Sequence, residues 1–307
     1  MNITFRQLKV FSEVARLNSV VRASEALHLT PPAVSLQVKS IEKEVGHTLF
    51  DRAGKRMTLT VAGEYFVVHA RRLLAGLKEA DEAMLRFDNL ESGHLNIAMV
   101  SAAKYFLPHM LSKFHKEHPS VDIRLKLGSR DQIDEMLINN EVDLCLMGRP
   151  PRKVPVVAQA FAEHPHVLVM SPKHELARID FIPANALVNV SFIVRETTSG
   201  TRSAFQEFLD QHQLQPNITM EMGSSEAIKQ AVIANMGVSF LSQHILAQEC
   251  ANGSLIVPKV EGLPLMRHWH IVSAASKQLS PAASAFRQFV LKDGEAHIDD
   301  MQLQVKA

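Results

Sequence analysis

Disulfide scaffolds and membrane spans are the first structures that this sequence argues against. It has only two cysteines, Cys145 and Cys250, in 307 residues, too few for a disulfide-stabilised framework. Cys145 lies in the apolar run VDLCLMG, where a cysteine usually serves as a small buried hydrophobic residue. No stretch approaches the roughly 20 continuous apolar residues that span a bilayer, and charges interrupt the first segment, MNITFRQLKVFSEVAR, unlike a secretory signal. We therefore expect a cytoplasmic protein without a membrane partner.

The sequence also lacks the common signatures of enzymes and metal sites. It contains no GxSxG, Walker A or GxGxxG motif in the required context, so nucleophilic or nucleotide chemistry has no candidate residues. The pairs His164/His166 and His268/His270 supply two ligands each, whereas a metal ion needs three or four that converge. We expect no catalytic residues, no metal and no resident cofactor.

Net charge is close to zero, at +1, but it is unevenly distributed. Residues 1–60 contain nine Lys and Arg against five Asp and Glu, a local balance of +4, which leaves the remainder slightly acidic. A modestly basic N-terminal segment suits a polyanionic partner.

The segment LTPPAVSLQVKSIEKEVG predicts a helix with one apolar side. Thr30 can cap it, and proline is tolerated in a first helical turn. Its apolar residues recur at spacings of four, three and four, and belong on one face: Val34, Val38, Ile41 and Val45. A short HLT connection joins this helix to the one before it, so the pair predicts a helix-turn-helix whose second helix can enter the major groove of DNA.

The next segment, TLFDRAGKRMTLT, predicts a hairpin with strands at Thr48–Phe50 and Met57–Thr60. Its turn carries Arg52, Lys55 and Arg56, whose cations suit phosphates or a minor groove. An ordinary solvated hairpin is the alternative.

Residues 61–89 predict one long helix with a coiled-coil stripe, which favours a dimer. The alternative is that the stripe packs on its own domain. The stripe consists of Phe66, Ala70, Leu73, Leu77, Ala80, Met84 and Phe87.

From residue 93 onward, predicted strands alternate with predicted helices, which indicates parallel βαβ units and two small α/β subdomains with a cleft between them. The polar tail from Asp293 onward is expected to fray. Predicted strands are Leu95–Val100, Val121–Leu127, Val142–Met147, His166–Met170, Ser191–Val194, Thr219–Met222, Val238–Leu241 and Trp269–Ser273.

Polar residues that follow these strands are candidates for an anion site, because open α/β folds bind ligands at the carboxyl ends of strands. In FIVRETTSGTRSAFQEFL a strand, a Ser/Thr/Gly turn and a helix follow one another, so N–H groups at the helix start can hold a carboxylate or phosphate. Ser101 and Ser129 are equally explained as simple helix caps. The candidates are Ser101, Ser129, Arg130, Arg149, Arg195, Ser199, Gly200, Thr201 and Arg202.

The stretch from LKVFSEVARLNSVVRASEALHLTPPAVSLQVKSIEKEVG through the hairpin resembles the N-terminal region of LysR-type transcriptional regulators, and LNIAMVSAAKYFLPHMLSKFHKEHPSVDIRLKLGSRDQIDEMLINNEVDLCLMG is similar to the first half of their effector domain. The resemblance covers residues 1 to about 290. It implies an all-α winged helix-turn-helix at 1–60, a linker helix at 61–89 and a periplasmic-binding-protein-like effector domain at 93–292. Its subdomain I would comprise 93–161 and 267–292, and subdomain II 162–266.

The resemblance implies base contacts from Pro31, Pro32, Ser35 and Leu36, with Lys39 on the same exposed side and wing contacts from Arg52 to Arg56. Many members carry Gln where Pro31 stands and Arg where Leu36 stands, so hydrogen-bond readout is poorer here. Val21 occupies the usual Ser or Thr cap of the second helix, a cost of about 1 kcal/mol unless Ser19 caps it.

The family also implies a tetramer built from dimers that bends promoter DNA at a T-N11-A-like core and contacts RNA polymerase. The segment RETTSGTR most resembles the branch that regulates carbon-fixation (RuBisCO) operons, whose effectors are phosphorylated sugars or NADPH. We expect a transcriptional activator that responds to a small anion. Alternatives are a solute-binding module, an enzyme with an added DNA-binding head, and a regulator of another operon that responds to a carboxylate.

Overall fold

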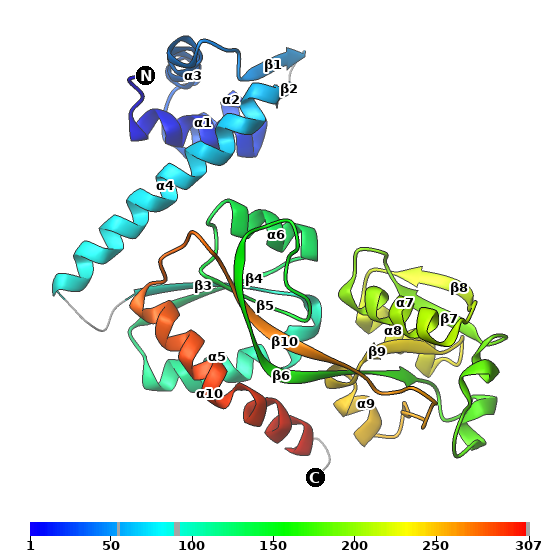
Figure 1. The fold of residues 1–307 in the computed structure, drawn as a ribbon. Coiled ribbons are helices and arrows are strands. Elements are labelled where there is room, and N and C mark those ends of the chain that lie inside the picture. Colours follow the sequence, from blue (N-terminus) through cyan, green and yellow to red (C-terminus); the bar gives the residue numbers. More distant parts are fainter. Residues whose placement is uncertain (54–55, 89–92, 305–307) are drawn as a thin grey trace. The chain divides into compact units, whose positions relative to one another are not determined.

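The computed structural model describes residues 1–53, 56–88 and 93–304, and the chain divides near residue 90 into two compact units (Figure 1). The first unit contains helices α1 (Phe5–Leu17), α2 (Val20–Ala26) and α3 (Pro31–Val45), strands β1 (Phe50–Ala53) and β2 (Arg56–Leu59), and the long helix α4 (Val61–Asp88).

Side-chain hydroxyl groups cap the N-termini of α2 and α3. The Thr30 hydroxyl accepts a hydrogen bond from the Ala33 N–H at 3.4 Å, which confirms the predicted cap of α3. The Ser19 hydroxyl accepts one from the Arg22 N–H at 3.3 Å. Ser19 therefore supplies the cap that Val21 cannot provide, and satisfies a backbone donor that would otherwise lack a partner.

The core of the first unit forms around Phe11, which is fully buried. Its ring centroid lies 5.2 Å from that of Phe50 and 5.0 Å from that of Phe66, the latter edge to face. The predicted apolar side of α3 packs into the same core, which holds the helix by its back. Fully buried residues of α3 are Val34, Val38 and Ile41.

The wing hairpin is present, with Phe50 paired to Leu59 in an antiparallel register. Its first strand begins two residues later than predicted. The N–H groups of Leu49 and Phe50 both donate to the Glu42 carboxylate, at 2.9 and 3.2 Å. Because the Leu49 N–H is bound to Glu42 of α3 instead of to the opposite strand, regular strand pairing starts only at Phe50.

The stripe on α4 is divided between two environments. Ala70 is 1% exposed and Phe66 contacts Phe11, so these two residues pack within their own unit, as the alternative to a dimer seam supposes. Leu73 and Leu77 are 55% and 39% exposed, and Ala80 is exposed as well. The side chains of Met84 and Phe87 lie outside the described residues.

The second unit contains two subdomains and a mixed sheet of order β4-β3-β5-β10-β6-β9, with a separate β7-β8 pair. The predicted parallel units occur at β3–β4, β3–β5 and β7–β8, whereas β10 and β6 are antiparallel to their neighbours. Its strands are β3 (Gly93–Met99), β4 (Val121–Leu127), β5 (Leu144–Met147), β6 (Val156–Val169), β7 (Ser191–Arg195), β8 (Asn217–Met222), β9 (Ser239–Ser242) and β10 (Leu265–Ala274). Its α-helices are α5 (Leu107–Glu117), α6 (Arg130–Ile138), α7 (Gly200–His212), α8 (Ser225–Ile233), α9 (Ala247–Ala251) and α10 (Pro281–Gln304), with short 3-10 turns at Ser101–Tyr105, Glu175–Arg178, Ala184–Leu187 and Gln243–Ile245.

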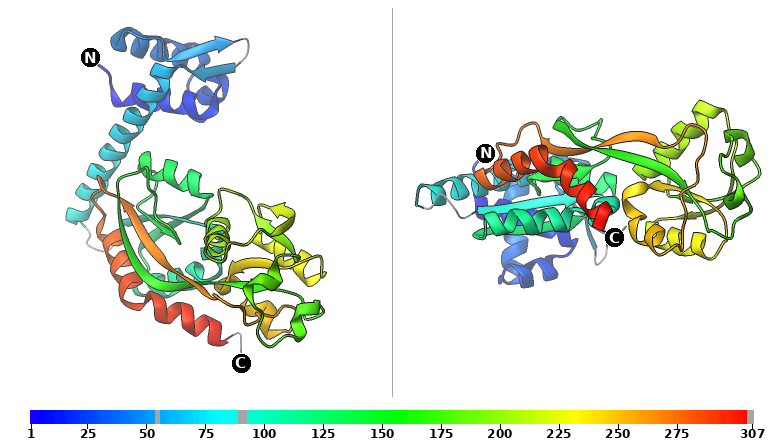
Figure 2. Two further views of the ribbon diagram at one scale, coloured as in Figure 1. Left: turned by 45° about the vertical axis from the view of Figure 1, so that its right-hand side comes forward. Right: turned by 90° about the horizontal axis from the view of Figure 1, so that it is seen from below.

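Strands β6 and β10 run side by side from one subdomain into the other (Figures 1 and 2). The predicted crossing points, at 161/162 and 266/267, fall inside these two strands. The pair changes register between Trp269 and His270. A continuous two-stranded ribbon therefore joins the subdomains.

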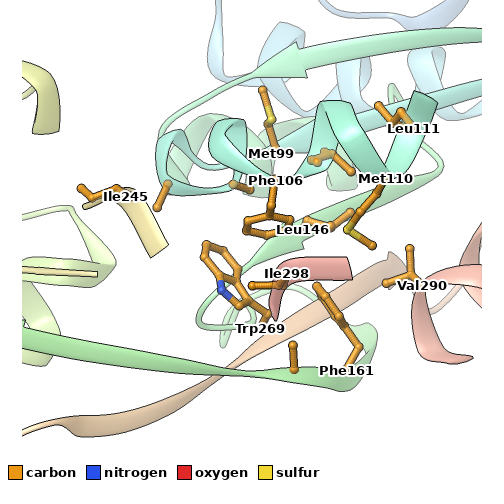
Figure 3. Close-up of a cluster of buried hydrophobic side chains, with 14 of the residues drawn as sticks. Met99, Phe106, Met110, Leu111, Leu146, Phe161, Ile245, Trp269, Val290 and Ile298 are labelled. Carbon is orange, nitrogen blue, oxygen red and sulfur yellow. The ribbon is translucent and has the colours of Figure 1, made fainter. Parts of the chain in front are cut away.

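Side chains of the ribbon lie within the largest hydrophobic core of the described residues (Figure 3). Trp269 is fully buried, and its ring packs edge to face on Phe106 at 4.9 Å. Its indole N–H donates to His244 Nδ1 at 2.9 Å, which satisfies the buried donor. Buried residues from both subdomains, such as Leu146 and Ile245, belong to this cluster.

The expectation that the chain frays from Asp293 onward is wrong, because α10 extends to Gln304. Phe286, Val290 and Ile298 are 0–2% exposed. Their spacings of four and eight place them on one helical face, which packs on the core despite the polar composition of the tail. Within the part of the chain that the structure describes, neither α4, α10 nor any shorter helix has the apolar length of a membrane span.

Candidate functional site

The outer face of α3 presents most of the residues predicted to contact DNA. Pro31, Pro32 and Lys39 are exposed and Ser35 is partly exposed, while Leu36 is 69% exposed. The apolar back of the helix is buried, so this face is free to approach a groove. Leu36 cannot hydrogen-bond a base edge but can contact a thymine methyl group.

The wing residues are placed only in part. Arg52 and Arg56 lie on β1 and β2, close to the end of the hairpin where Ala53 pairs with Arg56. Their side chains, and Lys55 entirely, lie outside the described residues. Their contact with DNA stays a prediction.

The second unit contains a pocket at the place where three strands end. Residues that follow β3, β4 and β7 meet there, together with one residue each from β6 and β10. The lining consists of Val100, Ser101, Ala102, Gly128, Ser129, Arg130, His164, Arg195, Glu196, Thr198, Ser199, Gly200, Thr201 and Trp269. Seven of the nine predicted effector residues are therefore brought together.

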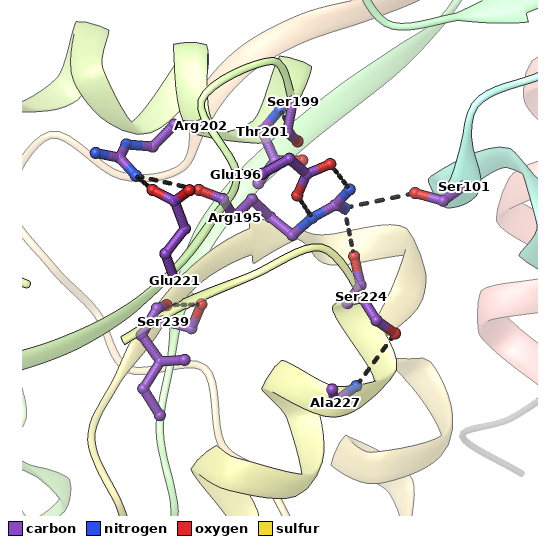
Figure 4. Close-up of polar contacts among 12 residues, drawn as sticks. Ser101, Arg195, Glu196, Ser199, Thr201, Arg202, Glu221, Ser224, Ala227 and Ser239 are labelled. Atoms are coloured by element: carbon purple, nitrogen blue, oxygen red, sulfur yellow. Dashed lines mark hydrogen bonds and ion pairs between the residues drawn. The ribbon is translucent and has the colours of Figure 1, made fainter. Parts of the chain in front are cut away.

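Arg195, which the sequence predicts as a cation that anchors a ligand, already forms hydrogen bonds within the protein (Figure 4). Its side chain is 8% exposed, and its guanidinium donates to both carboxylate oxygens of Glu196, each at 2.7 Å. Its Nη1 donates to the Ser225 hydroxyl at 2.8 Å and to Ser101 at 3.4 Å. Glu196 thus neutralises the positive charge of Arg195 within the pocket.

Two serines of the lining act as helix caps. The Ser199 hydroxyl accepts from the Thr201 N–H at 3.2 Å at the start of α7. The Ser129 hydroxyl accepts from the Gln132 N–H at 3.3 Å at the start of α6. Both helix starts therefore reach the pocket with first-turn N–H groups, which favour negative charge.

Arg149 and Arg202 are absent from this lining. Arg202 donates to Glu221 at 3.2 Å and to the Arg195 carbonyl oxygen at 3.1 Å, and Figure 4 shows it directed toward Glu221, away from Ser101. Arg202 is therefore paired outside the lining, and its contact with a ligand stays a prediction. Arg149 is partly buried, and the residue before it, Gly148, lies against His164 of the lining.

Seven lining residues were not predicted, and three of them, Glu196, His164 and Trp269, make notable contacts. Glu196 directly follows Arg195 in RETTSGTR, and this adjacency was an available signal for the ion pair. His164 and Trp269 lie on the ribbon strands, and their rings stack at 3.9 Å with 15° between planes. The motifs EHPH and RHWH that contain them predict ordinary strand and surface histidines and too few ligands for a metal, and the described residues hold no cluster of three or more His, Cys, Asp or Glu that could bind one.

His164 and Cys145 are buried titratable groups. Burial, followed by the nearness of His166 and His244, lowers the pKa of His164 well below its usual value, so the ring is neutral. Burial raises the pKa of the Cys145 thiol to about 12, which agrees with its predicted role as a small hydrophobic residue.

Comparison with known proteins covers nearly the whole chain. Residues 5–64 match the model of a bacterial regulatory helix-turn-helix protein of the lysR family, and residues 88–295 match the LysR substrate binding domain. The regulator CfxR of Cupriavidus necator is 42% identical, covering 94% of this chain and 92% of its own. The RuBisCO operon transcriptional regulator of Allochromatium vinosum is 41% identical, covering 95% and 97%.

Solved structures show the same architecture. The CcmR regulatory domain of Synechocystis PCC6803, in complex with 2-PG, is 36% identical with a TM-score of 0.63, covering 65% of this chain and 96% of that one. Full-length CbnR complexed with its target DNA is 20% identical with a TM-score of 0.70, covering 94% and 99%. This second likeness shows the fold alone. The helix-turn-helix with its exposed recognition face and the two-subdomain unit with its pocket thus both belong to one family: the chain is a LysR-type transcriptional regulator, not an enzyme.

Proposed function

We propose that this regulator controls a carbon-fixation (RuBisCO) operon and responds to a small phosphorylated metabolite bound in the pocket. The observation that carries the proposal is the convergence of two helix starts, the Thr201 hydroxyl and Arg130 at the ends of strands. Support comes from the 36% identical CcmR domain, whose complex contains 2-PG, and from the relatives named as RuBisCO operon regulators.

The ligand would act by contacting both subdomains. Ser101, Ser129 and Arg130 belong to the predicted subdomain I, whereas Ser199 and Thr201 belong to subdomain II. A ligand that binds between them favours one arrangement of the subdomains only if it binds that arrangement more tightly. We propose that this change alters DNA bending and contact with RNA polymerase, and that the protein works in the cytoplasm as an activator assembled from two dimers.

A footprint combined with a ligand panel tests the proposal. The protein should protect a partly palindromic T-N11-A site upstream of a RuBisCO operon, and 2-phosphoglycolate should change the protected pattern. The panel also contains a phosphorylated sugar, NADPH and a dicarboxylate, each scored by the shift in melting temperature of the protein. Thr201→Val should lose the ligand response but keep DNA binding. A response to the dicarboxylate alone would reject the phosphorylated class.

Wing cations should contribute to DNA affinity without sequence preference. Lys55→Ala and Arg56→Ala should each weaken binding to all sequences and reduce the salt slope by about one unit, since each removes one phosphate contact. Fluorescence anisotropy over a salt series measures this slope. Arg124→Ala removes a 61% exposed cation of the second unit and should leave the slope unchanged. Normal binding by the wing variants would contradict their role.

The exposed part of α4 should hold two copies of the chain together. Leu73→Glu with Leu77→Glu places charges on residues that are 55% and 39% exposed, so a folding defect is not expected. Sedimentation equilibrium should show at least a halving of mass relative to the parent protein. Val61→Glu, at a 73% exposed position of the same helix outside the stripe, should keep the parent mass. An unchanged mass in the double variant would exclude this seam.

A further inference from the structure

Arginines from three separate elements gather beside the effector pocket. Arg130 opens α6, Arg149 and Arg152 follow β5, and Arg267 lies on β10. Arg130 donates to the Pro150 carbonyl oxygen at 3.4 Å, next to Arg149 in the chain. Arg130 also lines the pocket, so the group of arginines adjoins the ligand site.

Acidic groups compensate these cations only in part. Arg267 pairs with Glu207, and Asp134 lies within electrostatic reach of Arg130. Among the described residues, no hydrogen bond or ion pair of the Arg149 side chain is found, although it is partly buried. Burial, followed by the nearby Arg152, Arg130 and Arg267, lowers the pKa of Arg149, and Glu207 opposes this shift only in part. Cations held together at such a cost are typical of a site that binds an anion.

A buried polar atom at the adjoining wall of the pocket also lacks a partner. His164 is 4% exposed and lines the pocket, and its Nε2 lies 2.9 Å from the Ser242 hydroxyl. Its Nδ1 has no hydrogen bond. A Cβ on Gly148 would lie 2.7 Å from Nδ1, so the residue just before Arg149 lies against this edge of the ring and only glycine fits there. Buried polar atoms are nearly always paired, which indicates that a ligand or water completes His164.

The pocket by itself carries little net charge, because Glu196 neutralises Arg195. A ligand with two anionic groups needs more positive charge than Arg130 alone supplies. Arg149 is the neighbouring cation that forms no ion pair among the described side chains; the nearby Glu207 pairs with Arg267 instead.

We propose that Arg149, with Arg130 and Arg267, forms a second anion subsite continuous with the effector pocket, and that His164 Nδ1 hydrogen-bonds the ligand where the two parts meet. The effector then carries an anionic group at each end, one held by the starts of α6 and α7 and the other by the arginines. This inference rests on the proposed function, because it assumes an effector in that pocket.

Isothermal titration with two probes on the full-length protein tests the subsite. Arg149→Gln should weaken binding of 2-phosphoglycolate, which has two anionic groups, at least tenfold. It should change the affinity for inorganic phosphate less than twofold. Arg152→Gln removes the same charge from an exposed position of the same loop and should affect both probes less than threefold. Equal losses of affinity for both probes, or equal losses in the two variants, would indicate a general electrostatic effect of the positive charges. Either result would overturn the subsite.

A crystal soak decides the matter independently of the effector. At the high concentration of a soak, selenate, located by its anomalous scattering, should occupy both the helix starts, where phosphate binds in the titration, and a weaker site within hydrogen-bond distance of Arg149; only the second should be lost in Arg149→Gln. Absence of selenate at Arg149 in the parent protein would overturn the inference. If 2-phosphoglycolate fails to bind the parent protein while selenate occupies Arg149, the proposed effector is wrong and the subsite stands.

Discussion

Replacing Glu196 by glutamine should increase the affinity of the pocket for phosphate-bearing ligands at least tenfold. The carboxylate of Glu196 accepts two hydrogen bonds from Arg195, each at 2.7 Å, and so occupies the place where an incoming anion would bind. Glutamine has nearly the same shape without the charge. An anion would then meet a buried guanidinium that lacks a counterion. Isothermal titration with 2-phosphoglycolate and with inorganic phosphate measures the change.

The same substitution should reduce stability in the absence of ligand. Leaving a buried charge unpaired costs several kcal/mol when both partners are fully buried. The Glu196 side chain is 30% exposed, so we expect a loss of about 2 kcal/mol. A phosphate concentration of about 100 times its dissociation constant restores about 2.7 kcal/mol. The melting temperature of the second unit should therefore fall in Glu196→Gln and recover with phosphate.

Glu221→Gln is the matched control. It removes the carboxylate that pairs with Arg202 at 3.2 Å, outside the pocket lining. Its effect on stability should be smaller, since Glu221 is 49% exposed, and phosphate should not reverse it. Unchanged anion affinity in Glu196→Gln, or equal phosphate rescue in both variants, would show that Glu196 does not compete with the ligand.

Gly63→Ala should abolish DNA binding while effector binding remains. A Cβ at this position in the first turn of α4 would lie 2.0 Å from the carbonyl oxygen of Leu49. That oxygen accepts from the Thr60 N–H at 3.0 Å, and the N–H of the same peptide, that of Phe50, donates to Glu42 at 3.2 Å. Because both sides of this peptide are held, it cannot move aside as a flexible side chain would. We expect the first unit to lose about 3 kcal/mol or more, at the upper end of the usual cost of overpacking.

Gly76→Ala, on the same helix, is the control for helix propensity. No atom lies within 4 Å of the Cβ that it adds, so alanine should stabilise α4 by about 0.5–1 kcal/mol. Gel-shift titration measures DNA affinity, and calorimetry resolves the melting of the two units. Parent-like DNA affinity in Gly63→Ala would mean that the wing and α4 can separate without loss of function.

Much of the DNA-binding unit was predictable because its determinants are local. The cap at Thr30 and the apolar spacing of Val34, Val38 and Ile41 depend on residues within a few positions of each other. These interactions act in any helix of this sequence. The start of the wing strand was misplaced because Glu42 binds the backbone of Leu49 and Phe50, an interaction across seven and eight residues that no local pattern reports.

Tertiary packing also determines which residues of the apolar stripe on α4 are buried and which are exposed. Its spacing predicts an apolar face but cannot tell a second copy of the chain from the chain's own core. Phe66 and Ala70 pack on their own unit, and the exposed residues begin at Leu73. In α10 the sequence predicted too little structure. The polar composition of the tail indicated fraying, but one apolar face of this helix packs on the core.

The sequence by itself determined the family, the order of the domains and most of the strand ends that meet at the pocket, because periodicity, caps and motif order are properties of neighbouring residues. Only the tertiary structure decided which of the other arginines are free. Arg195 pairs with Glu196, its neighbour in the chain, but Arg202 on α7 is held by Glu221 on β8, and Arg149 lies near Arg130 and Arg267 without an ion pair among the described residues. Charges from distant parts of the chain meet only on folding, and the energy of an ion pair depends on their distance and burial.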